Sequence, residues 1–133
     1  MTTDTIPAPA PDLTALIHRL YQLEIDKQLD PWMELWDPAF TVTFPLATHP
    51  AIEPIRGLDT LRSITRQKMI DRVKIELDVR VELMANPLKA LVFLGVVHHM
   101  ADGSVRQISL LCMFSFTAMG RILLLEEFFN QAG

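Results

Sequence analysis

The sequence lacks several features that would assign it to a familiar functional class. Its 133 residues include one cysteine, Cys112, which excludes an internal disulfide and a cysteine-based metal cluster. The 12 Lys and Arg residues are scattered among 16 Asp and Glu, and the net charge of -4 offers no basic surface for nucleic acid. The longest apolar runs, such as residues 90–97, are too short to span a bilayer. We therefore expect neither nucleic acid nor a membrane as a partner.

Motifs for metals, phosphates and secretion are also missing. The four histidines show no HxH or HExxH spacing, and there is no Gly-rich phosphate-binding loop. The N-terminal stretch MTTDTIPAPAPD has neither the basic nor the apolar segment of a signal peptide. The sequence thus predicts a cytoplasmic protein that works without a metal or an organic cofactor.

The composition is that of one globular domain. Hydrophobic residues make up 50% of the chain and charged residues 21%, and the length suffices for a substantial core. Residues 1–11 are rich in Thr, Pro and Ala, which predicts a disordered tail. Residues 12–133 are predicted to form the single domain.

The first half of this domain is patterned mainly as helices. Asp12 is a suitable N-cap for a first helix, whose apolar residues recur at helical spacing. Pro31 follows a second possible cap, Asp30, and proline is favoured at the first helical position. Helices are predicted over residues 13–28, 30–36 and 57–69, with a strand over 40–44 and a proline-rich loop over 46–55.

The second half is patterned as strands. Apolar and polar residues alternate or form short β-rich runs, and turn residues such as Asn86-Pro87 and Asp102-Gly103 separate them. Strands are predicted over residues 73–84, 89–100, 104–117 and 121–130. This order predicts an α+β fold in which the helices cover one face of a strongly curved antiparallel sheet.

The two last turns allow the strand register to be predicted. If Asp102-Gly103 and Met119-Gly120 are two-residue loops, Phe93 lies opposite Cys112, and Cys112 lies opposite Glu127. One face then carries a nearly continuous set of apolar residues with Glu127 as its one carboxylate. This face is predicted to hold Phe93, Gly95, Val97, Ile108, Leu110, Cys112, Phe114, Leu125, Glu127 and Phe129.

Glu127 is the strongest candidate for a proton-transfer group. It follows Glu126 in the last strand, and consecutive strand residues point to opposite faces. A carboxylate against apolar walls has a raised pKa unless it is paired, and a raised pKa suits acid–base chemistry near neutral pH. The alternative is a carboxylate that reaches water or pairs with an arginine.

The opposite face is predicted to be a subunit interface. It carries Leu111, Met113, Leu124 and Phe128 among Ser, Gln and Glu residues, which is typical of an apolar contact with a polar rim. We therefore expect a homodimer through the outer face of the sheet.

Several motifs resemble the nuclear transport factor 2-like superfamily, in its SnoaL-like branch. They are LWDPAF at residues 35–40, PIRGLDTL at 54–61, and GRI at 120–122 followed by EFFN at 127–130. The resemblance covers residues 12–130. It implies a cone-shaped curved sheet wrapped around three N-terminal helices, usually in a dimer, with a deep apolar pocket between sheet and helices.

The resemblance also allows each catalytic pattern of the superfamily to be tested by residue. Ketosteroid isomerases would place acids at Phe44 and Cys112, and limonene epoxide hydrolases would place an Arg and an Asp near Phe93 and Gly95. In both cases those residues are missing. Epoxide hydrolases and phenazine-pathway proteins place an acid at Glu127, although the phenazine-pathway histidine would fall near Ile64. The scytalone dehydratase branch places an aspartate at Asp26, but its histidine would fall near Lys74. No pattern is complete.

The leading hypothesis is a small enzyme that uses Glu127, assisted by Asp26 or Tyr21, for proton transfer on an apolar polyketide-, steroid- or terpenoid-like molecule. The reaction would be isomerisation, cyclisation, dehydration or epoxide opening. The alternatives are a non-catalytic protein that binds an apolar ligand, and an interaction domain that uses the outer sheet face. Tyr21, Trp36 and Phe44 could equally be core residues, and Asp26 could be a solvated residue near a helix end. The predicted ligand contacts are Tyr21, Trp36, Phe44, Phe93, Leu110, Cys112, Phe114 and Phe129.

Overall fold

The fold consists of three helices and a six-stranded sheet. The computed structural model describes residues 9–47 and 51–129, so most of the predicted tail lies outside the described residues. The elements are α1 (Leu13–Ile25), α2 (Leu29–Met33), β1 (Trp36–Thr43), β2 (Ile55–Arg56), α3 (Leu58–Asp71), β3 (Arg72–Leu83), β4 (Lys89–Met100), β5 (Val105–Phe116) and β6 (Ile122–Phe128). No helix in the described part of the chain is both long and apolar enough to cross a membrane.

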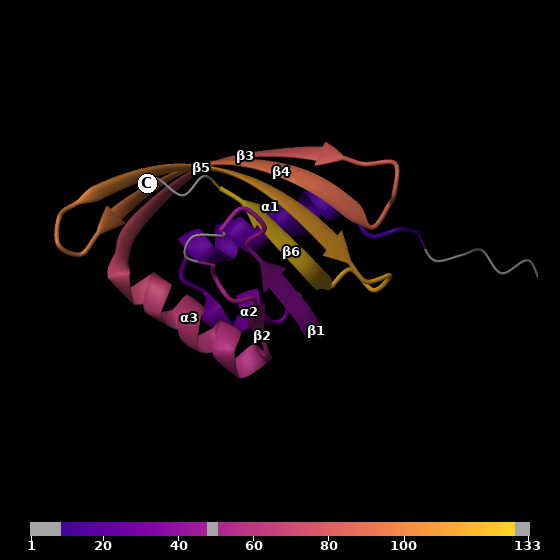
Figure 1. The fold of residues 1–133 in the computed structure, drawn as a ribbon, viewed down its shortest axis with the longest axis horizontal. Coiled ribbons are helices and arrows are strands. Elements are labelled where there is room, and N and C mark those ends of the chain that lie inside the picture. The colour runs from indigo at the N-terminus through magenta and orange to yellow at the C-terminus, as the bar shows by residue number, and fades with distance from the viewer. Residues whose placement is uncertain (1–8, 48–50, 130–133) are drawn as a thin grey trace, which may run out of the picture.

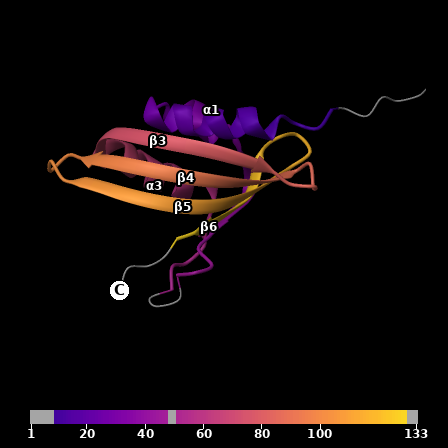
Figure 2. The same ribbon diagram turned by 90° about the horizontal axis from the view of Figure 1, so that it is seen from above.

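The sheet is curved and covers the helices on its concave side. Its strand order is β2-β1-β6-β5-β4-β3, and the long strands β3, β4 and β5 arch over α2 and α3 (Figure 1). Seen from above, α1 lies along β3 at one side of the arch (Figure 2). This is the α+β architecture that the sequence predicts. One pair departs from the expected antiparallel sheet, because β1 runs parallel to β6.

The start of β1 corrects a sequence prediction. The second helix was expected to continue through Trp36, but α2 ends at Met33 and Trp36 already belongs to β1. The reason is pairing with the end of the chain: the Ile122 amide donates to the Leu35 carbonyl at 2.8 Å, and Trp36 lies opposite Ile122. Contacts with a distant strand here override the local helical preference.

The β5–β6 hairpin has the predicted pairs beyond its turn. The loop itself has three residues, because the Thr117 amide donates to the Arg121 carbonyl at 2.8 Å, and an irregularity between Ser115 and Phe116 restores the expected register. Cys112 lies opposite Glu127 and Phe114 opposite Leu125, so Glu127 points to the same side as the core residue Phe114. The outer side of this hairpin carries Leu111 opposite Phe128, as predicted.

The β4–β5 hairpin differs from its prediction by one residue. The Met100 amide donates to the Ser104 carbonyl at 2.9 Å, which leaves a three-residue loop ending at Gly103 with φ of 87°. Such loops place a glycine in the left-handed conformation. Phe93 therefore lies opposite Leu111, and the predicted inward position of Phe93 is wrong. A shift of one residue exchanges the two faces of a strand, so Leu94, Val96 and His98 of β4 point inward, whereas Phe93, Gly95 and Val97 point outward.

The hydrophobic core fills the space between the sheet and α1. Ile17 of α1, Phe40 of β1, Val92 of β4 and Phe114 of β5 are each almost completely buried. Burial of one such side chain contributes about 1.5–3 kcal/mol. The core occupies one part of the concave face and leaves the part beside α3 for a cavity.

Candidate active site

An apolar cavity of about 250 Å³ lies between the concave face of the sheet and the helices. All three helices and every strand contribute to its wall. Its apolar lining residues are Leu20, Tyr21, Trp32, Trp36, Val42, Phe44, Ile55, Leu61, Ile64, Leu77, Leu94, Val96, Ile108, Leu110, Leu125 and Phe129, and its polar ones are Glu24, Thr65, Lys68, Arg72, His98 and Glu127. A small apolar cavity with a few convergent polar groups is the usual form of a small-molecule site.

Glu127 lies in this wall, as the sequence predicts. It projects inward from the end of β6, opposite the buried Cys112. Burial raises the pKa of its carboxyl above the ordinary value, and the positive charges of Lys68 and Arg72 lower it only in part. A carboxyl in this environment takes up and releases protons closer to neutral pH than an exposed one.

Glu24 is a second carboxylate in the cavity, and the sequence reasoning missed it. It lies in the last turn of α1, and burial raises the pKa of its carboxyl, with a further rise from the nearby charge of Glu127. A signal for it exists in the sequence. Leu13, Ile17 and Leu20 are buried at spacings of four and three, and Glu24 follows at the next helical position of the same stripe.

Lys68 and Arg72 bring two positive charges to the same part of the wall. Lys68 continues the inward stripe of α3 after Leu61 and Thr65, at spacings of four and three, and Arg72 follows as the first residue of β3. None of the ion pairs or side-chain hydrogen bonds among the described residues joins either cation to Glu24, Glu127 or any other group. These cations therefore act on the glutamates through space and keep their hydrogen-bond donors free.

His98 is the inward-facing histidine of β4. It is 6% exposed and lines the cavity, and its Nδ1 atom has no hydrogen-bond partner among the described residues. Burial first, and then the charges of Arg72, Lys68 and Arg106, lower the pKa of its ring to about 4. His98 is thus neutral at physiological pH. The neighbouring His99 faces outward and lies 3.0 Å from a carboxylate oxygen of Glu76.

Tyr21 contributes a hydroxyl to the cavity. Its ring packs edge-on against Phe114 at 6.4 Å, and burial raises the pKa of its hydroxyl well above the usual value. Tyr21 therefore remains a protonated hydrogen-bond donor. The Cys112 thiol beside it is completely buried in the core, and burial raises its pKa, which makes it a poor nucleophile.

The structure brings together some of the other predicted site residues and separates the rest. Trp36, Phe44, Leu110 and Phe129 line the cavity, and the rings of Phe44 and Phe129 are 6.0 Å apart. Cys112 and Phe114 lie in the core and are not among the lining residues. The remaining two predicted residues, Phe93 and Asp26, are displaced from the cavity altogether.

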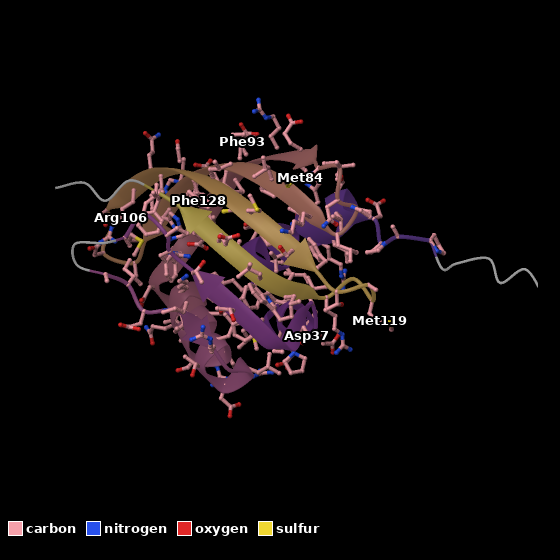
Figure 3. The ribbon with its side chains drawn as sticks, turned by 45° about the vertical axis from the view of Figure 1, so that its right-hand side comes forward. Asp37, Met84, Phe93, Arg106, Met119 and Phe128 are labelled. Atoms are coloured by element: carbon pink, nitrogen blue, oxygen red, sulfur yellow. The ribbon has the colours of Figure 1, made fainter. Side chains whose placement is uncertain are left out.

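Phe93 and Asp26 are both at the surface. Phe93 is on the side of the sheet away from α3 (Figure 3), where the Arg80 guanidinium carbon lies 4.4 Å from its ring centroid. Asp26 is the exposed C-cap of α1, and its carboxylate accepts hydrogen bonds of 3.1 and 3.2 Å from the Gln22 side chain. Helical geometry explains the second case, because Asp26 lies two residues beyond the inward-facing Glu24 and so points elsewhere.

The cavity has an apolar end and a polar end. The indoles of Trp32 and Trp36 pack at 5.2 Å at one end, where Trp36 lies opposite Ile122 at the start of β6. Glu127 is five residues further along β6, roughly 16 Å away at the usual rise of a strand. The other polar residues belong to the same end as Glu127, because they lie near the last residues of α1, α3 and β4.

Comparisons with known proteins identify the fold through structure rather than through sequence. No family model and no curated protein matches the chain. The chain is similar to AusH from Aspergillus nidulans, with 10% identity, a TM-score of 0.77, and coverage of 94% of this chain and 89% of that one. It is also similar to SalBIII, an epoxide hydrolase/cyclase-like enzyme studied for pyran ring formation in the polyether salinomycin, with 13% identity, a TM-score of 0.76, and coverage of 90% and 91%.

A third similar structure is an NTF2-like protein from Exiguobacterium sp. 255-15. Its identity is 16% and its TM-score 0.71, and the match covers 88% of this chain and 99% of that one. At these identities the likeness concerns the fold and not the site. Together with the curved sheet and its cavity, it shows that the chain has the nuclear transport factor 2-like (NTF2-like, SnoaL-like) fold.

Proposed function

We propose that the protein is an acid–base enzyme that acts on a small, largely apolar molecule, with Glu127 and Glu24 as its proton-transfer groups. The observation that carries this proposal is the pair of carboxylates in one apolar cavity, one from α1 and one from β6. Burying a charged group is costly unless it is paired, and neither glutamate has an ion-pair partner among the described residues.

Two carboxyl groups in one apolar site favour a state in which one is protonated and the other ionised. Burial is the main cause of the raised pKa of Glu24, and the charge of Glu127 adds a smaller rise that Lys68 and Arg72 oppose. A pair in that state offers a general acid and a general base at the same time. Isomerisation, cyclisation, dehydration and epoxide opening each require one proton to be removed and one to be donated.

The remaining cavity residues suit this chemistry. The aromatic and aliphatic wall excludes water from the substrate and strengthens electrostatic interactions at the polar end. Tyr21 keeps its proton and can donate a hydrogen bond to a substrate oxygen. The similar structure of SalBIII, an epoxide hydrolase/cyclase-like enzyme, supports a reaction of this class without assigning it to this chain.

A purely ligand-binding protein is the main alternative, together with an interaction domain. The polar end argues against simple binding, because an apolar ligand would be held more stably by a wall without two buried carboxyls. A catalytic role in proton transfer explains why two carboxyls are buried there. Under this proposal both glutamates are needed for turnover, while ligand affinity depends mainly on the apolar wall.

The test is a titration of both carboxyls by carbon-13 NMR. Glu127→Gln and Glu24→Gln assign the two resonances, and Glu126→Gln, the outward-facing neighbour, is the matched control. We expect both carboxyls to titrate above the ordinary value of 4.5, and Glu24 to titrate at lower pH in Glu127→Gln, because the like charge is gone. Two independent titrations at the ordinary value would reject the proposal.

A further inference from the structure

The polar end of the cavity holds two positively charged side chains that form no ion pair among the described residues. Lys68 and Arg72 both line the wall, and neither takes part in an ion pair or side-chain hydrogen bond among the described residues. Burial raises the pKa of both Glu24 and Glu127, and the positive charges of Lys68 and Arg72 oppose that rise. The guanidinium of Arg72 stays charged although burial lowers its pKa.

The surroundings of the two cations do not supply the missing anion. Asp71 acts on Arg72 through its charge but forms no ion pair with it among the described residues, and its oxygen accepts a hydrogen bond of 2.8 Å from the Gln67 side chain. Arg106, near the β4–β5 hairpin at the same end of the molecule (Figure 3), adds positive charge. The buried His98 is neutral, and its Nδ1 atom lacks a partner within the described chain. Two cations on one cavity wall, both without an ion-pair partner in the described part of the chain, fit an anionic ligand.

We propose that the substrate is an apolar carboxylic acid bound as its anion, with the carboxylate held by Lys68 and Arg72 and the apolar body extending toward Trp32 and Trp36. This inference rests on the proposed function, since it names the substrate class of the same cavity. An arginine fork matches a carboxylate in two parallel hydrogen bonds, and a lysine adds a point charge. A substrate carboxylate would supply the ion-pair partner that Lys68 and Arg72 lack among the described residues.

The position of the anion also locates the reaction on the substrate. Glu24 and Glu127 lie at the same end of the cavity as Lys68 and Arg72, whose positive charges lower the pKa of both carboxyls. The atoms that exchange protons are therefore within a few bonds of the carboxylate, while the far apolar part supplies binding energy. Binding energy from such a remote part is commonly used to position the reacting atoms.

Isothermal titration calorimetry with three probes of one chain length tests the proposal. The probes are octanoate, 1-octanol and octylamine at pH 7.5 and low salt, where exposed charges are least screened. We expect octanoate to bind at least tenfold more tightly than 1-octanol and octylamine to bind most weakly. Equal affinity for octanoate and 1-octanol, tighter binding of octylamine, or no heat with octanoate at millimolar concentration would overturn the proposal.

Variants show whether the two named cations are responsible. Lys68→Met/Arg72→Met keeps the length of both side chains and should remove the preference for octanoate while retaining 1-octanol binding. The matched control is Lys74→Met/Arg80→Met, which makes the same change of net charge on the outer face of the sheet. The control should bind octanoate as the wild type does, and an octanoate preference that survives in Lys68→Met/Arg72→Met would reject the assignment.

Failure of this proposal can be distinguished from failure of the proposed function. Glu127→Gln should retain the octanoate preference, because the glutamine does not alter Lys68 or Arg72. If octanoate binds as expected while both glutamates titrate at the ordinary pKa of a glutamate carboxyl, the anion site is supported and the acid–base function is rejected. If both glutamates titrate above the ordinary value and the protein binds octanoate no more tightly than 1-octanol, the acid–base function is supported and the carboxylate substrate is rejected.

Discussion

Charged residues on the two sides of the sheet differ in exposure and in ion pairing. On the outer face, the charges of β3 are exposed and paired: Lys74 lies 3.7 Å from Glu76, and Arg80 lies 3.6 Å from Glu82. On the inner face, Glu24, Glu127 and Arg72 are at least half-buried and are unpaired in the described part of the chain. Exposed pairs add little stability, and unpaired buried charges reduce it. Charge placed where it lowers stability indicates a functional site.

The substitution with the largest expected effect concerns the two adjacent glutamates of β6. Under the proposed function, Glu127→Gln should slow proton transfer by about 10²–10⁴-fold, the usual contribution of a general acid or base. Solvent-deuterium uptake beside the carbonyl of 2-octanone, followed by NMR, measures the rate. Glu126→Gln changes the next residue on the outer face and should leave the rate unchanged. Equal rates in the two variants would show that the inward position has no catalytic importance.

The outer face itself is expected to form a homodimer interface. Its apolar strip holds Leu111, Met113, Leu124 and Phe128, and the structure adds Phe93, which is 38% exposed. The β3 charges of both signs border this strip, so a second copy turned by a two-fold axis can match them.

Phe128→Glu or Leu111→Glu should convert such a dimer to a monomer in size-exclusion chromatography, because a charge would be buried at its centre. Ile70→Glu introduces the same charge at a 64% exposed position on α3 and serves as the control. Elution of all three variants with the wild type would exclude this interface.

A smaller effect is expected on stability, and its sign depends on pH. The pKa of Glu24 is raised in the folded protein above the ordinary value of 4.5 that applies to the unfolded chain. The folded state therefore binds more protons than the unfolded state once the pH exceeds 4.5. Stability is therefore full below pH 4.5 and falls as the pH rises through the folded pKa. Glu24→Gln removes this loss and should stabilise the protein by about 1–3 kcal/mol at pH 8, the usual cost of an unsatisfied buried group.

Thermal melts of Glu24→Gln and wild type at pH 4 and pH 8 measure this difference. The gain in Tm should be small at pH 4 and larger at pH 8. A gain that is equal at both values would mean that the glutamine improves packing and that the carboxyl is not strained by its burial.

The smallest effect is expected for the exposed pair on the outer face. Glu82→Gln removes the partner of Arg80, and both side chains are more than half exposed. The free energy of unfolding should change by about 0.2–1 kcal/mol at most, and the change should shrink in high salt. Urea denaturation at two salt concentrations measures it. A salt-independent change larger than this range would contradict the contrast between the faces.

Much of the fold follows from local sequence patterns. The alternation in β3 and the capped stripe of α1 identify their elements, and β4 has the predicted limits. The expected turn at Met119-Gly120 gave the correct facing for Glu127, although the loop has three residues, because an irregularity between Ser115 and Phe116 offsets the difference. The predicted secondary structure was wrong where contacts between distant residues determine it. Trp36 is an example, because its strand conformation depends on pairing with β6.

The site was predicted less completely than the fold. Glu127 was predicted. Glu24 was missed because the inward face of α1 was identified from its apolar residues alone, and the carboxylate that continues this face was not considered. His98 was missed because the β4–β5 loop has three residues where two were expected. That single residue reverses the faces of β4, moving His98 in and Phe93 out.

By itself the sequence determined the elements, their order, the α+β class and the inward carboxylate of β6, because each depends on the spacing of residues that are near one another in the chain. Only the tertiary structure decided which charges meet. Glu24, Lys68, Arg72, His98 and Glu127 come from five different elements, and they converge because the ends of α1, α3, β4 and β6 and the start of β3 lie at the same end of the curved sheet. The physical reason is that the curvature and pairing of a sheet depend on contacts between residues far apart in sequence, which local spacing does not encode.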